Sequence, residues 1–338
     1  MNMAYLDNLL ICLPYMAVIW VYAGLILLRI IRKYKELNYI INELIIFGCY
    51  MGVSFLLPIM MVIPAWSVLI QLLVVGLLLI IPLIEYRHIK KWEQNGEVEK
   101  IKARDYEAFI AQFPAEYTTA RDIRRKLYHV FIPLIIIISY SAALAIGEFN
   151  GVTSDQFGRF LIFNIGFALV TLFTLGDLFR LYNFKYLPGW AVNLFTSAMK
   201  KKELNSYSSP DGTIMAIALF FILPFPIFAS IAMLIGVSDA VASLVGKNLG
   251  KIKLKAGSDK KLEGTIAGAL VGIVATLLLC FIFQPDWAWY VIALLTLVAG
   301  GVFALFDYLD LPKINDNLSV TIVAGLLMGL IAWGFGLL

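Results

Sequence analysis

The residues of this chain that could do chemistry are concentrated between positions 236 and 264, where an acid, spaced glycines and six lysines interrupt apolar sequence. Asp239 lies within an apolar run. A carboxylate at membrane depth costs roughly 2.5–3.5 kcal/mol on insertion scales, so such residues usually serve a function. Gly246 and Gly250 follow, with Lys247 directly after the first of them. Because glycines let a backbone approach a ligand closely and free N–H groups beside lysines bind phosphate, the pattern predicts a site for a phosphate-bearing ligand.

The end of this segment adds a second acid to the pattern. It closes with Lys260, Lys261, Glu263 and Gly264. Acids that hold Mg²⁺ beside lysines that hold polyphosphate are what a nucleotide-using enzyme needs, so Asp239 and Glu263 are predicted metal ligands. The alternative interpretation is that lysines at the end of a membrane helix only set the topology of the chain. The buried acid, the glycine spacing and the second acid together favour the site.

Two further motifs flank apolar segments. Lys126 and His129 lie three positions apart and share one helix face at the start of an apolar segment. By themselves they could be an interfacial anchor. Asp316 and Asn317 begin the last apolar segment. They could cap that helix, or Asp316 could be a site acid facing Asp239.

The composition defines the class of protein. The chain has 338 residues, of which 61% are hydrophobic and 15% charged, and its mean hydropathy is +0.86. These values exclude an ordinary soluble globule and a disordered chain. Several stretches exceed about 18 mostly apolar residues, which predicts an all-α, polytopic helical membrane protein. The three cysteines lie in apolar segments without a metal-binding or redox spacing, and we expect no nucleic-acid partner.

The distribution of Lys and Arg predicts the topology. Residues 212–246 are ambiguous because Pro224 and Pro226 interrupt them. Two membrane spans in this segment place the lysine-rich residues 247–261 on the same side as the other basic loops. The chain is then predicted to cross the membrane about ten times, with both termini outside and the polar motifs on the cytoplasmic face. The basic segment 87–126 is predicted to lie on the membrane face as amphipathic helix.

Several other kinds of chemistry find no matching pattern. The sequence has no G-x-x-x-x-G-K-[ST] loop, no protein-kinase glycine loop and no G-x-S-x-G elbow. A transporter would carry acids deep in several spans and show two corresponding halves. Here the acids gather at one predicted face, which favours an enzyme over a transporter.

The central motif, SDAVASLVGKNLGK followed by KKLEGT, resembles that of the dolichol kinase and phytol kinase family of CTP-dependent lipid-alcohol kinases. The resemblance begins at RRKLYHV, residues 124–130, and continues to the C-terminus, so it covers about residues 121–338. The related phosphatidate cytidylyltransferases share much of the central motif. Their closing signature is absent, whereas Asp316, Asn317, Ser319 and Val320 match the closing motif of the kinases.

The resemblance implies CTP as the phosphate donor and Mg²⁺ as the metal. It also implies catalytic roles for Asp239, Asp316, Lys126 and His129. Asp177 stands where the family has glutamate, and its alternative role is simply to pair with Arg180, three positions on. The predicted nucleotide-binding residues are Ser238, Gly246, Lys247, Gly250, Lys260, Lys261, Gly264 and Asn317.

Together these patterns predict an integral, multi-pass membrane enzyme that transfers the terminal phosphate of CTP to a polyprenol-type alcohol such as dolichol, polyprenol or phytol. A cytidylyltransferase that makes a CDP-lipid is the alternative, and a transporter comes third. Residues 121–338 are predicted to form a seven-helix catalytic domain. Residues 1–120 are predicted to form a three-helix membrane region with an amphipathic cytoplasmic segment, whose function is left open. The sequence also leaves open which alcohol is used and the oligomeric state.

Overall fold

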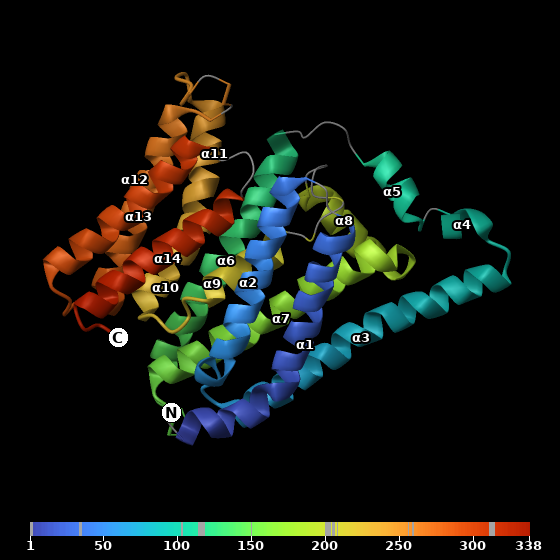
Figure 1. Ribbon diagram of the computed structural model, residues 1–338, viewed down its shortest axis with the longest axis horizontal. Coiled ribbons are helices and arrows are strands. Elements are labelled where there is room, and N and C mark those ends of the chain that lie inside the picture. The colour runs from blue at the N-terminus through green and yellow to red at the C-terminus, as the bar shows by residue number, and fades with distance from the viewer. Residues whose placement is uncertain are drawn as a thin grey trace.

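The fold is a bundle of membrane-length helices with the polar loops gathered at one end (Figure 1). The computed structural model describes residues 3–33, 36–102, 104–113, 119–149, 151–199, 204, 207, 209–255, 257–258, 260–310 and 315–338. Within these ranges the structure is helical and contains no strand. The elements are α1 (Met3–Lys33), α2 (Leu37–Met60), α3 (Pro64–Gln94), α4 (Val98–Lys102), α5 (Tyr106–Gln112), α6 (Thr119–Ile146), α7 (Ser154–Tyr182), η1 (Phe184–Tyr186), α8 (Gly189–Ala198), α9 (Ser209–Ala218), α10 (Phe225–Met233), η3 (Leu234–Ser238), α11 (Asp239–Asn248), α12 (Leu262–Phe283), α13 (Trp289–Leu309) and α14 (Asp316–Gly334).

The predicted all-α, polytopic membrane architecture is confirmed. Across the described ranges, nine helices are long and apolar enough to span a membrane. One of them is the continuous helix formed by α10, η3 and α11, residues Phe225–Asn248. The tenth predicted membrane crossing corresponds to the segment that contains α9. This helix has only ten residues and is about 15 Å long.

The ambiguous segment 212–246 reverses direction, as the lysine distribution predicts. The chain leaves helical geometry after α9 and resumes it at Phe225, because Pro224 and Pro226 suit the start of a helix and not its interior. Arg159, near the start of α7, donates from Nη1 to the Phe221 carbonyl oxygen at 2.7 Å. The reversal therefore lies at the end of the bundle where α7 begins, opposite the lysine-rich loop.

The first three helices pack on the rest of the bundle, and α1 and α2 share its apolar core. Gln71 Nε2 on α3 donates to Asn164 Oδ1 on α7 at 3.0 Å. Glu43 Oε1 on α2 accepts a hydrogen bond from the Tyr207 backbone N–H at 3.1 Å. One buried apolar cluster contains residues of α1 and α2 together with residues of α10, α13 and α14. The division at residue 120 stays a prediction based on the family motifs.

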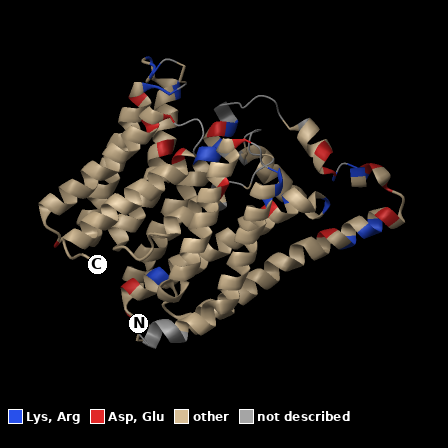
Figure 2. Cartoon of the chain, in the orientation of Figure 1, with Lys and Arg blue, Asp and Glu red and all other residues tan. Residues whose placement is uncertain are grey.

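The polar loops and both chain ends lie at opposite ends of the bundle. Figure 1 shows the N- and C-termini together at the lower end, and Figure 2 shows charged residues at the upper end, where α11 ends and α12 begins, and at the far end of α3. The predicted amphipathic segment is divided in the structure. α3 continues to Gln94, and the short helices α4 and α5 follow it before α6 begins.

Candidate active site

An ion pair joins the first turns of α6 to the start of α11. Lys126 Nζ contacts the Asp239 carboxylate, although the two residues are 113 positions apart. The Lys126 side chain is almost buried, whereas Asp239 keeps 29% of its side chain exposed. His129, one turn further along α6, is buried and acts electrostatically on Asp239. Three of the predicted catalytic residues therefore lie together.

A widened helical turn positions Asp239. Residues Leu234–Ser238 form a π-helical turn, a feature that is frequent at functional sites. Gly236 lies where this turn crosses α6. A Cβ atom there would come within 2.7 Å of the His129 carbonyl oxygen and of Pro133 Cγ. The close crossing that brings the start of α11 against α6 therefore requires glycine.

Asp122, one turn before Lys126 on α6, was not predicted from the sequence. Its carboxylate is buried. It accepts hydrogen bonds from Lys247 Nζ at 2.5 Å and from Ser243 Oγ at 3.1 Å, and Arg125 Nη2 lies 3.5 Å from its other oxygen. Asp122 thus holds a predicted nucleotide-binding lysine against α6. The sequence could have indicated Asp122 through its four-residue spacing from Lys126, which places both residues on one helix face.

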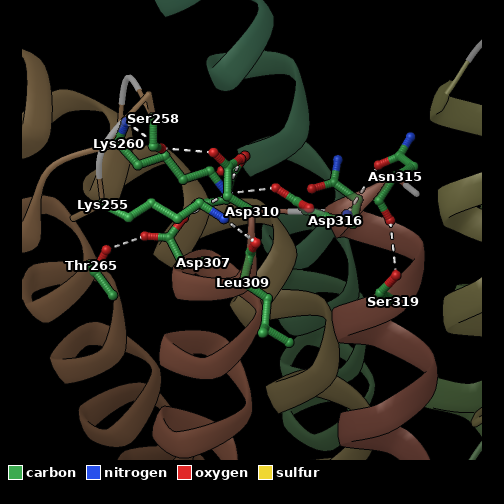
Figure 3. A network of polar contacts seen from close by, with 12 residues as sticks. Lys255, Ser258, Lys260, Thr265, Asp307, Leu309, Asp310, Asn315, Asp316 and Ser319 are labelled. Carbon is green, nitrogen blue, oxygen red and sulfur yellow. Dashed lines mark hydrogen bonds and ion pairs between the residues drawn. The ribbon is translucent and has the colours of Figure 1, made fainter. Parts of the chain in front are cut away.

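A second polar cluster surrounds Lys260 in the loop before α12 (Figure 3). Lys260 Nζ lies 2.6 Å from Asp316 Oδ2, 3.0 Å from Asp307 Oδ1 and 3.5 Å from Asp310 Oδ1. Thr265 Oγ1 on α12 donates to the Asp307 carboxylate. Asp307 and Asp310 were also missed by the sequence predictions. The sequence could have indicated them as two acids three positions apart, close to the motif that contains Asp316.

The charges in this second cluster stabilise one another. Burial opposes the charge on Lys260, but the carboxylates of Asp316 and Asp307 outweigh burial and raise the pKa of Lys260 above its ordinary value. Burial likewise opposes ionisation of Asp310. The hydrogen bond from Ser258 Oγ (2.7 Å) and the charge of Lys260 outweigh it and lower the Asp310 pKa. Both Lys260 and Asp310 are therefore charged at neutral pH.

A small pocket lies between the two clusters. Its polar lining comes from Asp239 on α11, Asp307 on α13, and Asp316 and Asn317 on α14. The structure thus brings together Asp239 and the predicted pair Asp316 and Asn317, which are far apart in the sequence. The apolar part of the lining is Leu234, Ile235, Phe303 and Val320.

Asp316 is not the N-cap of α14. Asn315 is the cap residue, and its Oδ1 accepts a hydrogen bond from the Asn317 backbone N–H at 3.0 Å. Asp316 is the first residue of the helix, and its carboxylate faces Lys260. Of the two roles predicted for Asp316, the helix cap is therefore excluded by the geometry, and the site acid stays a proposal.

Glu263 and Ser238 lie outside the pocket, and their predicted roles stay predictions. Glu263 Oε1 accepts hydrogen bonds from the backbone N–H groups of Lys251 (2.9 Å) and Ile252 (3.2 Å), so this carboxylate anchors a loop. Ser238 is fully buried, and its Oγ lies 3.3 Å from the place of a Cβ at Gly272 on α12. Neither Glu263 nor Ser238 lines the pocket.

The predicted phosphate-binding glycines also have a different explanation. A Cβ atom on Gly264 would lie 2.5 Å from the Ala242 carbonyl oxygen and 2.9 Å from Gly246 Cα. A Cβ atom on Gly250 would lie 2.6 Å from Lys261 Cβ. Small residues let membrane helices approach closely. These positions therefore require glycine for the packing of α11 and its loop against α12, whether or not phosphate binds there.

The side chains that line the pocket suit a hard cation such as Mg²⁺ only in part. Across the described residues, no three His, Cys, Asp or Glu side chains are grouped so that they could hold a metal ion. Mg²⁺, however, is usually bound by one or two carboxylates together with substrate phosphates and water. The carboxylates of Asp239, Asp307 and Asp316 on one pocket fit that mode. Chemically, the site offers carboxylates for a cation or a proton and lysines for phosphate.

No family model matches this chain, and no solved structure matches it. The chain is similar to CTP-dependent diacylglycerol kinase 1 of Saccharomyces cerevisiae. The two share 25% identity over 255 residues, which cover 68% of this chain and 79% of the yeast protein. Like the families that the sequence motifs resemble, that relative is named as a CTP-dependent lipid kinase, although its name specifies diacylglycerol and not dolichol or phytol.

Proposed function

We propose that this protein is a CTP-dependent lipid kinase, which transfers the terminal phosphate of CTP to the hydroxyl group of a lipid alcohol. The observation that carries the proposal is the convergence of Asp239 and Asp316 on one pocket, each paired with a lysine. Phosphoryl transfer needs positioning and charge neutralisation more than covalent chemistry. The similarity to a CTP-dependent diacylglycerol kinase supports the same reaction class.

In this proposal the lysines and the acids have different tasks. Lys247, Lys260 and Lys261 bind the phosphates of CTP, and Lys126 holds Asp239 in place through their ion pair. Asp316 accepts the proton of the lipid hydroxyl. The hydroxyl oxygen then forms a bond to the terminal phosphorus, and the bond from that phosphorus to the oxygen of CDP breaks. The products are CDP and a phosphorylated lipid, and every atom is accounted for without a further reactant.

Mg²⁺ belongs to the proposal and is supported only by the chemistry of the pocket. When bound, this ion would neutralise charge on the phosphates of the nucleotide. Asp239, together with Asp307 or Asp316, would hold it. Glu263 is left out of this set because it does not line the pocket and its carboxylate accepts hydrogen bonds from the backbone of the loop.

Two classes of lipid alcohol are candidates for the substrate. The sequence motifs favour a polyprenol-type alcohol such as dolichol, polyprenol or phytol. The name of the yeast relative favours diacylglycerol. We propose diacylglycerol as the first substrate to test, because it is the lipid named for the relative that matches 68% of this chain. The site is proposed to face the cytoplasm, where the lysine-rich loops are expected.

The proposal is tested with purified protein, CTP labelled in the base, and diacylglycerol, dolichol and phytol in parallel. We expect CDP to form in a one-to-one ratio with phosphorylated lipid, and ATP to serve poorly as a donor. Release of pyrophosphate with formation of a CDP-lipid would instead identify a cytidylyltransferase. Consumption of no nucleotide with any of these lipids would refute the kinase assignment.

A further inference from the structure

An apolar cavity lies inside the bundle, away from the polar pocket. It is enclosed by α2, α6, α7, α9 and α10, and every residue that lines it is apolar or glycine. The cavity volume is about 70 Å³, and the cavity is partly open to the surroundings. Protein interiors are normally close-packed, and apolar cavities exclude water and accept apolar molecules. A space of this kind inside a membrane protein therefore suits a hydrocarbon chain.

Helix α6 connects this cavity with the candidate active site. Lys126 and His129 lie in its first turns, and Ile132, which lines the cavity, follows His129 by three residues. That step is about 4.5 Å along the helix axis. Ile136 continues the cavity lining one turn further on. A lipid whose hydroxyl group lies near Lys126 would therefore reach the cavity by extending its chain along α6.

We propose that this cavity binds a hydrocarbon chain of the lipid substrate. The proposal rests on the proposed lipid kinase function and adds to it the location of the substrate chain. It also gives the N-terminal region a task, because Val53, Leu57 and Met60 of α2 form one wall of the cavity. The region that matches no kinase motif would then bind the chain, while the C-terminal helices provide the charged groups.

Gly166 on α7 provides the test. It lines the cavity, and a Cβ atom there would meet no other atom within 4 Å. Gly166→Leu should therefore fill the cavity without disturbing the helix packing. Gly48→Leu on α2 is the matched control, since its Cβ position is equally open and the residue is exposed and outside the cavity lining. Ala218→Leu, on α9 at the cavity wall, is a second filling variant in case the first folds poorly.

The measurement is kcat/KM for a series of lipid alcohols with the same hydroxyl end and increasing chain length. Gly166→Leu should lower kcat/KM for the longest chains about tenfold or more, on the scale of one group excluded from an apolar pocket. It should leave the shortest chains and the KM for CTP unchanged, and Gly48→Leu should change neither. An equal loss for short and long chains in both filling variants would overturn the proposal.

A photoreactive lipid separates this proposal from the kinase assignment. An alcohol with a diazirine near the end of its chain should label residues of α2 and α7 around the cavity in the wild type and much less in Gly166→Leu. Labelling confined to the outer surface of the bundle would overturn the chain-binding site. Cavity labelling in a protein that phosphorylates no lipid alcohol would support the site and overturn the kinase function.

Discussion

Two acid–cation pairs in this bundle have similar chemistry and different surroundings. Asp177 and Arg180 lie three positions apart on α7, are 3.0 Å apart and have no exposed side-chain surface. Arg180 Nη1 also donates to the Leu204 carbonyl oxygen at 2.5 Å and to the Tyr106 hydroxyl at 3.3 Å. Lys126 and Asp239 come from different helices instead, and the Asp239 side chain is partly exposed at a pocket.

The difference separates a structural pair from a candidate site pair. Around Asp177 and Arg180, protein groups from α5 and from position 204 fill the space, so the pair ties these segments to α7. Around Asp239, one side is open to a pocket that contains two further carboxylates, Asp307 and Asp316. An acid in an apolar sequence is therefore not by itself a site. The accessible space beside it makes the distinction.

The largest effect is expected where the fully buried pair is broken. Asp177→Asn leaves the Arg180 charge buried without its counter-charge, which should cost about 3–5 kcal/mol of unfolding free energy. Thermal unfolding of the purified protein in detergent measures this loss. Asp177→Glu, which keeps the charge, should lose less. A melting temperature for Asp177→Asn equal to that of the wild type would remove the contrast between the two pairs.

Asp239→Asn should affect activity more than stability, in contrast to Asp177→Asn. We expect turnover to fall about 10³-fold, within the range for loss of a catalytic group, while the melting temperature falls less than in Asp177→Asn because the Asp239 side chain is partly exposed. Nucleotide binding titrated against Mg²⁺ should weaken in parallel. Normal binding of both CTP and Mg²⁺ by this variant would show that Asp239 is a structural residue like Asp177.

Asp316→Asn tests the second acid of the pocket. If Asp316 accepts the proton of the alcohol, turnover should fall about 10²-fold with little change in stability. Asn315→Ala is the matched control, because loss of this cap should cost about 1 kcal/mol of stability and leave turnover unchanged. Full activity of a folded Asp316→Asn protein would exclude the role as a base.

Lys261→Ala should produce a smaller effect that is confined to the nucleotide. Loss of one partly exposed charge is worth up to about 1 kcal/mol, so the KM for CTP should rise about fivefold. The Mg²⁺ concentration needed for half-maximal activity should not change. Lys253→Ala, in the same loop, serves as a control for general charge. Equal effects of the two substitutions would mean that Lys261 contributes only to the overall positive charge of the loop and does not contact the nucleotide.

The smallest effect concerns the acid stability of the second cluster. Because the pKa of Asp310 is lowered, its contribution to stability is present above its ordinary pKa of 3.8 and is lost as the pH falls through the lowered value. Asp310 is partly exposed, so this contribution should be below about 1 kcal/mol. Melting temperatures measured between pH 3 and 7 should therefore fall slightly more on acidification in the wild type than in Asp310→Asn.

The sequence by itself determined the class of the protein and most of the polar residues of the site. Membrane helices are recognised from the chain because hydrocarbon requires long apolar segments with internally satisfied backbones. The lysine distribution gave the correct reversal between α9 and α10. Asp239 could be selected because a carboxylate is costly in apolar surroundings and is retained there only for a reason. Asp316 was selected because its segment resembles the closing motif of the lipid-alcohol kinases.

Only the tertiary structure decided which polar groups meet. Glu263 and Asp239 looked equivalent in the sequence, yet the loop backbone engages Glu263 and a pocket faces Asp239. The glycines looked like a phosphate loop, and the close contact of α11 and its loop with the start of α12 explains them as packing positions. Asp122 and Asp307 acquired their partners, Lys247 and Lys260, only through helix contacts. Such partners depend on how helices cross and rotate, which local sequence spacing does not specify.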